Sequence, residues 1–122
     1  MKYENLYNDF KNLFPSDINK LDKLASDNLI DDSDGMHVIF GMVVVPFLVE
    51  LVKNNDTNKI RIAFDFFEKM AKDSNSMISE VLEFTILEDI ISRGKKIINI
   101  CKPYMKKNTL DSCMKVEKYM LN

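Results

Sequence analysis

Twelve consecutive residues without a polar side chain, at positions 38–49, constrain the fold of this chain more than any other feature. The wider apolar segment, residues 36–52, is at the lower limit of length for crossing a bilayer, and Gly41, Pro46 and Glu50 interrupt it. Its β-branched residues would suit a strand, but the segment is far longer than a typical strand. We therefore predict a buried central helix and no membrane span. Because Pro46 lacks a backbone N–H, we expect it to kink this helix or to divide it in two.

The rest of the chain has the spacing of amphipathic helices separated by short polar breaks. Further helices are expected at residues 3–14, 16 to about 28, 60–71, 77–91, about 97–101 and 110–120. Glu68 falls on the polar half of its helix, and Thr109 is expected to cap the last one. The chain has only 3 Gly and 3 Pro, and this scarcity of turn residues disfavours a fold of many short strands. Because short loops place consecutive helices side by side, we predict an all-α single domain over residues 1–122, with about six helices packed as an antiparallel bundle or short α-solenoid.

Three polar residues lie where apolar neighbours are expected. On a helical wheel of residues 77–91, Glu88 and Asp89 both intrude on apolar arcs, and His37 lies near the start of the central helix. Carboxylates are rarely buried without a partner. We interpret Glu88, Asp89 and His37 as buried polar groups satisfied by a hydrogen bond or an ion pair, with contact to a binding partner as the alternative for each.

The residues that common catalytic sites use are scarce. The chain has one His, two Cys and no glycine-rich loop. Cys101 and Cys113 form no CxxC motif and are expected to be reduced thiols in the core. A small enzyme would need His37 and Glu88 to converge in one pocket. We predict no catalytic residue, no metal site and no cofactor, and so a protein that is not an enzyme.

The polar break at residues 31–35, Asp-Asp-Ser-Asp-Gly, resembles a calcium-binding loop only superficially. If Gly35 took the sixth position of such a loop, Ile30 would stand at the first and Gly41 at the twelfth, where carboxylates are required. We interpret the segment as a solvated capping loop, with a patch that faces a basic partner as the alternative.

Charge is divided unevenly along the chain. Residues 1–91 hold nine basic and seventeen acidic side chains, whereas residues 92–122 hold eight basic and two acidic ones, for a total of −2. With a single Arg in the basic third and a net acidic chain, nucleic acid is not expected as a partner. We expect the basic residues to keep the chain in solution or to pair with the acidic helices. Residues 1–10 lack the features of a secretory signal, so a cytoplasmic location is expected.

Two stretches resemble a group of small helical bacterial proteins of largely unassigned function. These are residues 66–71, FFEKMA, and residues 80–88, EVLEFTILE; residues 37–47 with their internal Pro also fit. The resemblance spans about residues 36–91. It implies an all-α fold, and proteins of this kind are often immunity proteins, encoded beside a polymorphic or contact-dependent toxin that they neutralise by binding.

The leading hypothesis is therefore a cytoplasmic immunity protein whose acidic surface binds a cognate toxin. A nuclease toxin with a basic cleft would be a suitable target. The expected partner-binding residues are Asp31, Asp32, Asp34, Glu80 and Glu83. The alternative is a helical adaptor or regulatory scaffold that binds a peptide or another cellular protein in an apolar groove. The sequence leaves open the identity of the partner, the oligomeric state, and whether the acidic face or the basic third forms the interface.

Overall fold

Each run of amphipathic spacing forms a helix in the computed structural model, which describes residues 1–121. The first half holds η1 (Tyr3–Asn5), α1 (Leu6–Lys11), η2 (Pro15–Asp17), α2 (Ile18–Asp27), α3 (Met36–Ile39), η3 (Phe40–Val44) and α4 (Val45–Lys53). The second half holds α5 (Thr57–Lys72), α6 (Ser76–Glu80), η4 (Val81–Leu87), α7 (Glu88–Ser92), α8 (Lys95–Cys101), η5 (Lys102–Tyr104) and α9 (Lys107–Leu121). Consecutive elements often merge, so the described residues hold seven continuous helical segments and no β-strand.

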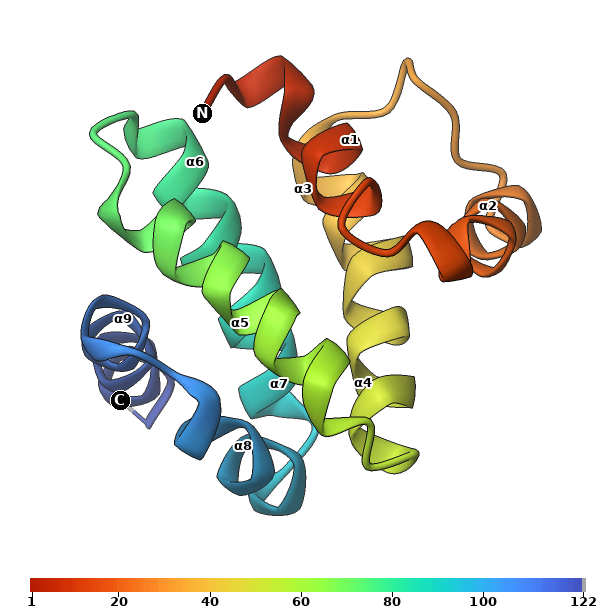
Figure 1. The fold of residues 1–122 in the computed structure, drawn as a ribbon. Coiled ribbons are helices and arrows are strands. Elements are labelled where there is room, and N and C mark those ends of the chain that lie inside the picture. The colour runs from red at the N-terminus through yellow and green to blue at the C-terminus, as the bar shows by residue number, and fades with distance from the viewer. Residues whose placement is uncertain (122) are drawn as a thin grey trace.

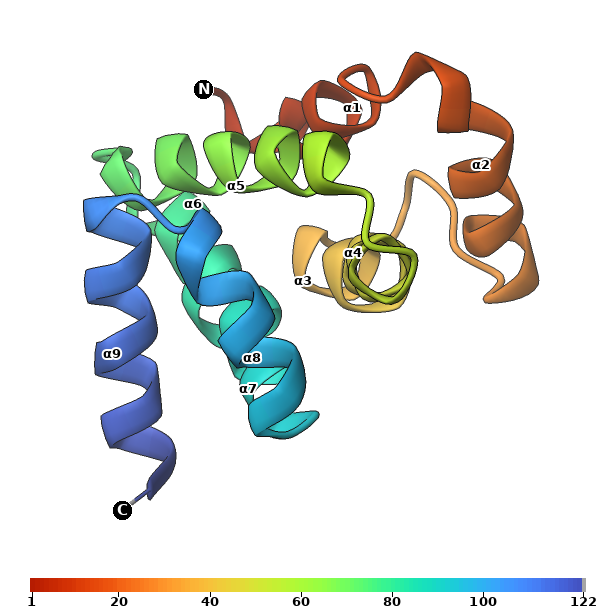
Figure 2. The ribbon, with the colours of Figure 1, turned by 60° about the horizontal axis from the view of Figure 1, so that its bottom comes forward.

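The predicted all-α fold is confirmed. Figure 1 shows the N-terminal helices on one side of the molecule and α8 and α9 on the other, with α4 and α5 between them. In Figure 2, α5 runs across the view, whereas α3 and α4 are seen nearly end-on and α9 descends steeply. Contacts join α5 to both α4 and α9. Helix α5 therefore bridges the two halves of the domain.

The capping of α5 shows why its sequence forms a helix there. The side chain of Asp56 accepts a hydrogen bond from the Lys59 backbone N–H at 3.3 Å, which satisfies one of the free donors of the first turn. Lys69 and Lys72 lie in the last turn, where cations interact favourably with the helix dipole. Apolar side chains such as Phe67 then face the core.

Phe10 on α1 lies at the centre of an aromatic cluster in the core. Its ring centroid is 5.0 to 6.4 Å from five other phenylalanine rings, and its own side chain is fully buried. These rings belong to Phe14, Phe40, Phe47, Phe66 and Phe67. Burying one such ring contributes roughly 1.5–3 kcal/mol. The cluster joins α1 to η3, α4 and α5.

The apolar segment forms one continuous helix, Met36–Lys53, in which η3 is π-helical. This 18-residue helix is long and apolar enough to cross a membrane. However, 56% of it is buried against the rest of the chain, and core helices of globular proteins are often as long and as apolar. The departure from α geometry ends just before Pro46, whose ring would clash with the carbonyl four residues earlier in a regular helix. The wider π turn thus accompanies the proline, and the segment is one helix rather than two.

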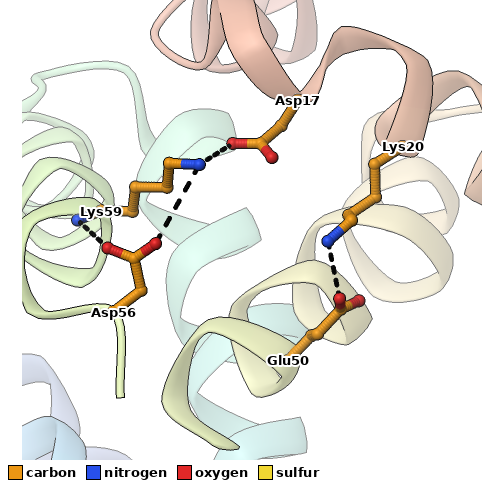
Figure 3. Close-up of polar contacts among 5 residues, drawn as sticks. All are labelled: Asp17, Lys20, Glu50, Asp56 and Lys59. Atoms are coloured by element: carbon orange, nitrogen blue, oxygen red, sulfur yellow. Dashed lines mark hydrogen bonds and ion pairs between the residues drawn. The ribbon is translucent and has the colours of Figure 1, made fainter. Parts of the chain in front are cut away.

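Ion pairs attach α2 and the end of η2 to the middle of the domain (Figure 3). The carboxylate of Asp17, which is 9% exposed, lies 2.7 Å from the Lys59 ammonium on α5. Lys20 on α2 contacts Glu50 on α4, also at 2.7 Å, but both of those side chains are more than 40% exposed. Because screening weakens exposed pairs, the Asp17–Lys59 pair is the stronger of these two contacts.

Glu68 corrects one expectation from the helical wheel. It lies on the predicted polar half of α5, yet it is only 9% exposed because α9 packs over it. Its carboxylate accepts hydrogen bonds from the backbone and side chain of Asn108, at 3.3 and 2.7 Å, and from those of Thr109, at 2.8 and 2.9 Å. Helix α9 begins at Lys107, so Thr109 lies within its first turn instead of capping it. Glu68 from α5 instead accepts hydrogen bonds from the first-turn backbone N–H groups of Asn108 and Thr109.

Candidate functional site

A groove lies between α1, α2 and the loop that follows α2. This loop contains residues 31–35, which we call the acidic loop, and the groove is the larger of two hollows that the loop lines. It has a volume of about 360 Å³, and a hollow of about 220 Å³ shares four of its residues. Together they form what we call the N-terminal groove. Its lining residues are Glu4, Tyr7, Asn8, Lys11, Asp22, Ala25, Ser26, Ile30, Asp31, Asp32, Met36 and Ile39.

The N-terminal groove is strongly acidic. Four carboxylates line it, from Glu4, Asp22, Asp31 and Asp32, against the single ammonium group of Lys11. Lys11 forms an ion pair with Asp22 across the groove, from α1 to α2. The other three carboxylates form no ion pair with any residue from 1 to 121. A concave surface lined by one sign of charge concentrates its field, so this groove attracts cations.

Hydrogen bonds within the acidic loop fix its shape. Asp31 accepts a hydrogen bond from the Ser33 N–H at 2.8 Å and another from the Ser33 hydroxyl, and these bonds lower the pKa of Asp31. The carboxylate of Asp34 accepts from the Asp31 N–H at 3.0 Å. The loop therefore directs Asp31 and Asp32 along the groove, whereas Asp34 is half-buried and holds the turn.

Tyr7 contributes an enclosed hydroxyl to the N-terminal groove. Its Oη is inaccessible to solvent and forms no hydrogen bond with the described part of the chain. Burial, with a smaller effect of Asp22, raises the pKa of Tyr7 to about 12, so the hydroxyl remains protonated. Its ring packs edge-on against Phe40. The sequence placed Tyr7 on an apolar stripe and missed this role; the only local signal was a hydroxyl-bearing aromatic at the edge of that stripe.

Glu80 and Glu83 do not belong to the N-terminal groove. Glu80 is exposed on α6. The Glu83 side chain is 13% exposed and pairs with Lys115 of α9 at 3.2 Å, so it is not the exposed acid that the sequence predicts; its role in binding a partner stays a prediction. The cause is that the basic α9 packs against η4. Lys106 pairs in the same way with Asp65 at 3.1 Å, which confirms pairing between the basic third and the acidic helices.

None of the three expected buried polar groups is fully buried, but His37 and Asp89 have the expected polar partners. His37 is exposed, since it lies in the first turn of its helix, although its Nδ1 is 2.6 Å from the Thr85 hydroxyl. Glu88 and Asp89 are half-buried, and Asp89 pairs with Arg93 at 2.7 Å. A wheel drawn at 100° per residue fails here, because the π-helical η4 advances less per residue and turns α7 relative to α6.

The two π-helical segments pack against each other. Gly41 in η3 makes the approach close, since a Cβ there would lie 3.4 Å from the Thr85 methyl in η4. The His37–Thr85 contact lies beside this seam. Segments of π-helix occur often at functional sites, where they displace side chains from the α-helical pattern. Ile39, directly before η3, lines the N-terminal groove, and Phe84 within η4 lines a second groove.

The second groove, which we call the η4–α9 groove, has a volume of about 190 Å³. Its lining residues are Glu83, Phe84, Glu88, Lys115, Val116 and Tyr119. His37 is not among them, so this groove does not unite the two residues that a small enzyme would have used. Cys101 and Cys113 are fully buried, and burial raises the pKa of each thiol to about 12. No three His, Cys, Asp or Glu residues within positions 1–121 are grouped as metal ligands.

A family described as a domain of unknown function, DUF7674, matches residues 7–120. The chain belongs to this family. The DUF7674 match extends from α1 into the last turn of α9, so both grooves lie within the family's domain, apart from Glu4. This agrees with the expected resemblance to a small helical family of unassigned function. Comparisons with curated proteins and with solved structures gave no match.

Proposed function

We propose that this DUF7674 protein binds a basic segment of a partner protein in the N-terminal groove, and that the partner is a toxin which it neutralises as an immunity protein. The observation that carries the proposal is the charge of the groove. Of its four carboxylates only Asp22 has an ion-pair partner among residues 1–121, the ammonium of Lys11. Glu4, Asp31 and Asp32 therefore remain available to a cationic ligand.

The chemistry of the groove suits a lysine or arginine side chain. Ile39, Met36 and the Tyr7 ring give an apolar floor for the methylene stem, and the carboxylates above it receive the charged end. Acidic grooves of this kind also accelerate association with a basic partner and select against acidic ones.

The choice of a toxin as partner rests on what the resemblance at residues 66–71 and 80–88 implies, since small helical bacterial proteins of that kind are often immunity proteins. Binding alone is sufficient for neutralisation, because a protein seated on a basic active-site cleft excludes its substrate. The proposal needs no catalytic group in this chain. A cytoplasmic location and the absence of enzymatic activity stay predictions.

The test uses the product of a toxin gene adjacent to the gene of this protein. The Asp31→Lys/Asp32→Lys double variant is compared with Glu80→Lys, which reverses an exposed acid outside the groove. We expect the double variant to bind at least about tenfold more weakly, mainly through slower association, and the wild-type association rate to fall with added salt. Glu80→Lys should bind and protect like wild type. Equal binding by the double variant, or no complex with the toxin, would overturn the proposal.

The η4–α9 groove favours a second candidate function, a helical adaptor that binds a peptide of another cellular protein. Phe84 is 53% exposed and Tyr119 is 70% exposed, and both border the same groove, so together they offer an apolar surface to a peptide. An adaptor would bind its peptide without protecting cells from a toxin. Pull-down from the source cells followed by mass spectrometry separates the two functions: a recovered toxin favours neutralisation, and a recovered housekeeping protein favours the adaptor.

A further inference from the structure

The η4–α9 groove combines an aromatic surface with an unpaired carboxylate. Phe84 and Tyr119 are exposed at its edges, and Val116 is 3% exposed at its base. Helix α9 contacts η4, and Figure 2 shows α9 beside the helix that contains η4. The charged groups that border this surface are the carboxylates of Glu83 and Glu88 and the ammonium of Lys115. Its affinity for a ligand therefore depends on how these charges are paired.

The charges of the groove leave one acid over. Glu83 and Lys115 pair with each other at 3.2 Å and neutralise each other. Glu88 is half-buried, and its carboxylate forms no hydrogen bond or ion pair with residues 1–121. A partly desolvated carboxylate beside aromatic rings attracts a cation more strongly than a fully solvated one. The groove therefore carries one net negative charge on an apolar surface.

We propose that the η4–α9 groove binds one arginine side chain of a protein partner. A planar guanidinium can stack on the rings of Phe84 and Tyr119 while its N–H groups donate to the Glu88 carboxylate. Lysine presents a point charge without a planar face and suits the rings less well. The volume of about 190 Å³ is below the roughly 300–1,000 Å³ of sites for drug-sized ligands and fits a single side chain. The proposal does not require that the partner be a toxin.

The experiment titrates Nα-acetyl-L-arginine amide into the isotopically labelled full chain and follows the Val116 methyl and the Phe84 and Tyr119 rings by NMR. The citrulline analogue has nearly the same shape without the charge, and the norleucine analogue supplies only an apolar chain. We expect saturable shifts with arginine. Both analogues should bind about tenfold more weakly, because they lack the charge-assisted hydrogen bond to Glu88, and a tenfold change corresponds to about 1.4 kcal/mol. These comparisons use the unmodified protein and do not depend on any variant folding.

The variant Glu88→Gln removes the charge and keeps the shape of the side chain. It should bind the arginine probe about tenfold more weakly and the citrulline probe unchanged, whereas Glu80→Gln on the same continuous helix should behave like wild type. Equal shifts with norleucine would show a merely apolar groove and overturn the proposal. So would unchanged binding by Glu88→Gln, shifts confined to the N-terminal groove, or no shift at the solubility limit of the probe. If this proposal fails, the proposal for the N-terminal groove still stands, because different residues carry it.

Discussion

Replacing Glu68 with glutamine tests the link between α5 and α9. The carboxylate accepts four hydrogen bonds from Asn108 and Thr109, and Thr109 is fully buried. Glutamine keeps one acceptor oxygen, removes the charge and turns an amide N–H₂ toward donors. Hydrogen bonds to charged groups contribute about 1.5–3 kcal/mol each, and a buried donor left unpaired costs about 1–3 kcal/mol. We expect Glu68→Gln to lower the free energy of unfolding by about 2–4 kcal/mol at pH 7.

This loss should depend on pH in a defined direction. Burial raises the pKa of Glu68, but the hydrogen bonds from Asn108 and Thr109 lower it more, so it lies below its ordinary value of 4.5. A carboxyl whose pKa falls on folding stabilises the folded state fully above its unfolded pKa, and this contribution is lost as the pH falls through the folded pKa. The difference between wild type and Glu68→Gln is therefore complete at neutral pH and narrows below pH 4.5.

Urea denaturation followed by circular dichroism across this pH range measures both effects. Asp65→Asn is the matched control, because Asp65 lies on the same helix but its side chain is 48% exposed in a surface pair with Lys106. Such a pair contributes about 0–1 kcal/mol. The reasoning is refuted if Glu68→Gln lies within about 0.5 kcal/mol of wild type at pH 7, or if the difference stays constant into acid.

Three further predictions concern stability and reactivity. Lys59→Met leaves the buried Asp17 carboxylate unpaired and should cost about 1–3 kcal/mol in urea denaturation, whereas Lys20→Met, which breaks an exposed pair, should cost under about 1 kcal/mol; equal losses would contradict the assigned burial. Gly94 has φ of 109° and ψ of 167°, a backbone region almost restricted to glycine. Gly94→Ala should therefore lower the free energy of unfolding by about 1–3 kcal/mol and lower the melting temperature, and an unchanged melting temperature would count against this backbone geometry. Both buried cysteines, with pKa values of about 12, should react with a thiol reagent only after denaturation, and rapid modification of the native protein would argue against it.

The helices could be predicted from the sequence because each depends on a local pattern. The apolar spacing within α5 and α9 is a property of neighbouring residues, and burial follows from it. Glu68 shows where this reasoning ends. The wheel places it on the polar half of α5, but its burial depends on α9, whose Asn108 lies forty residues later in the chain. Only the packing of two distant helices reveals that contact.

The candidate grooves were predicted in part for the same reason. Asp31 and Asp32 were expected to meet a partner, and they line the N-terminal groove. The acidic residues that join them, Glu4 and Asp22, come from separate helices and gave no local signal. Glu88 interrupts the apolar pattern in the sequence, although a regular helical wheel does not describe a segment with π geometry.

The helix Met36–Lys53 also has a consequence for synthesis of the chain. Of the described elements that cover it, α1 and α2 precede it in the chain, whereas α5, η4 and α8 leave the ribosome after it does. During that interval its apolar residues are exposed, and such segments are prone to aggregate or to be bound by chaperones. The apolar side chains that complete the core therefore limit how slowly the domain can fold. Helix α5 and η4 must pack against the Met36–Lys53 helix before it contacts another incompletely folded chain.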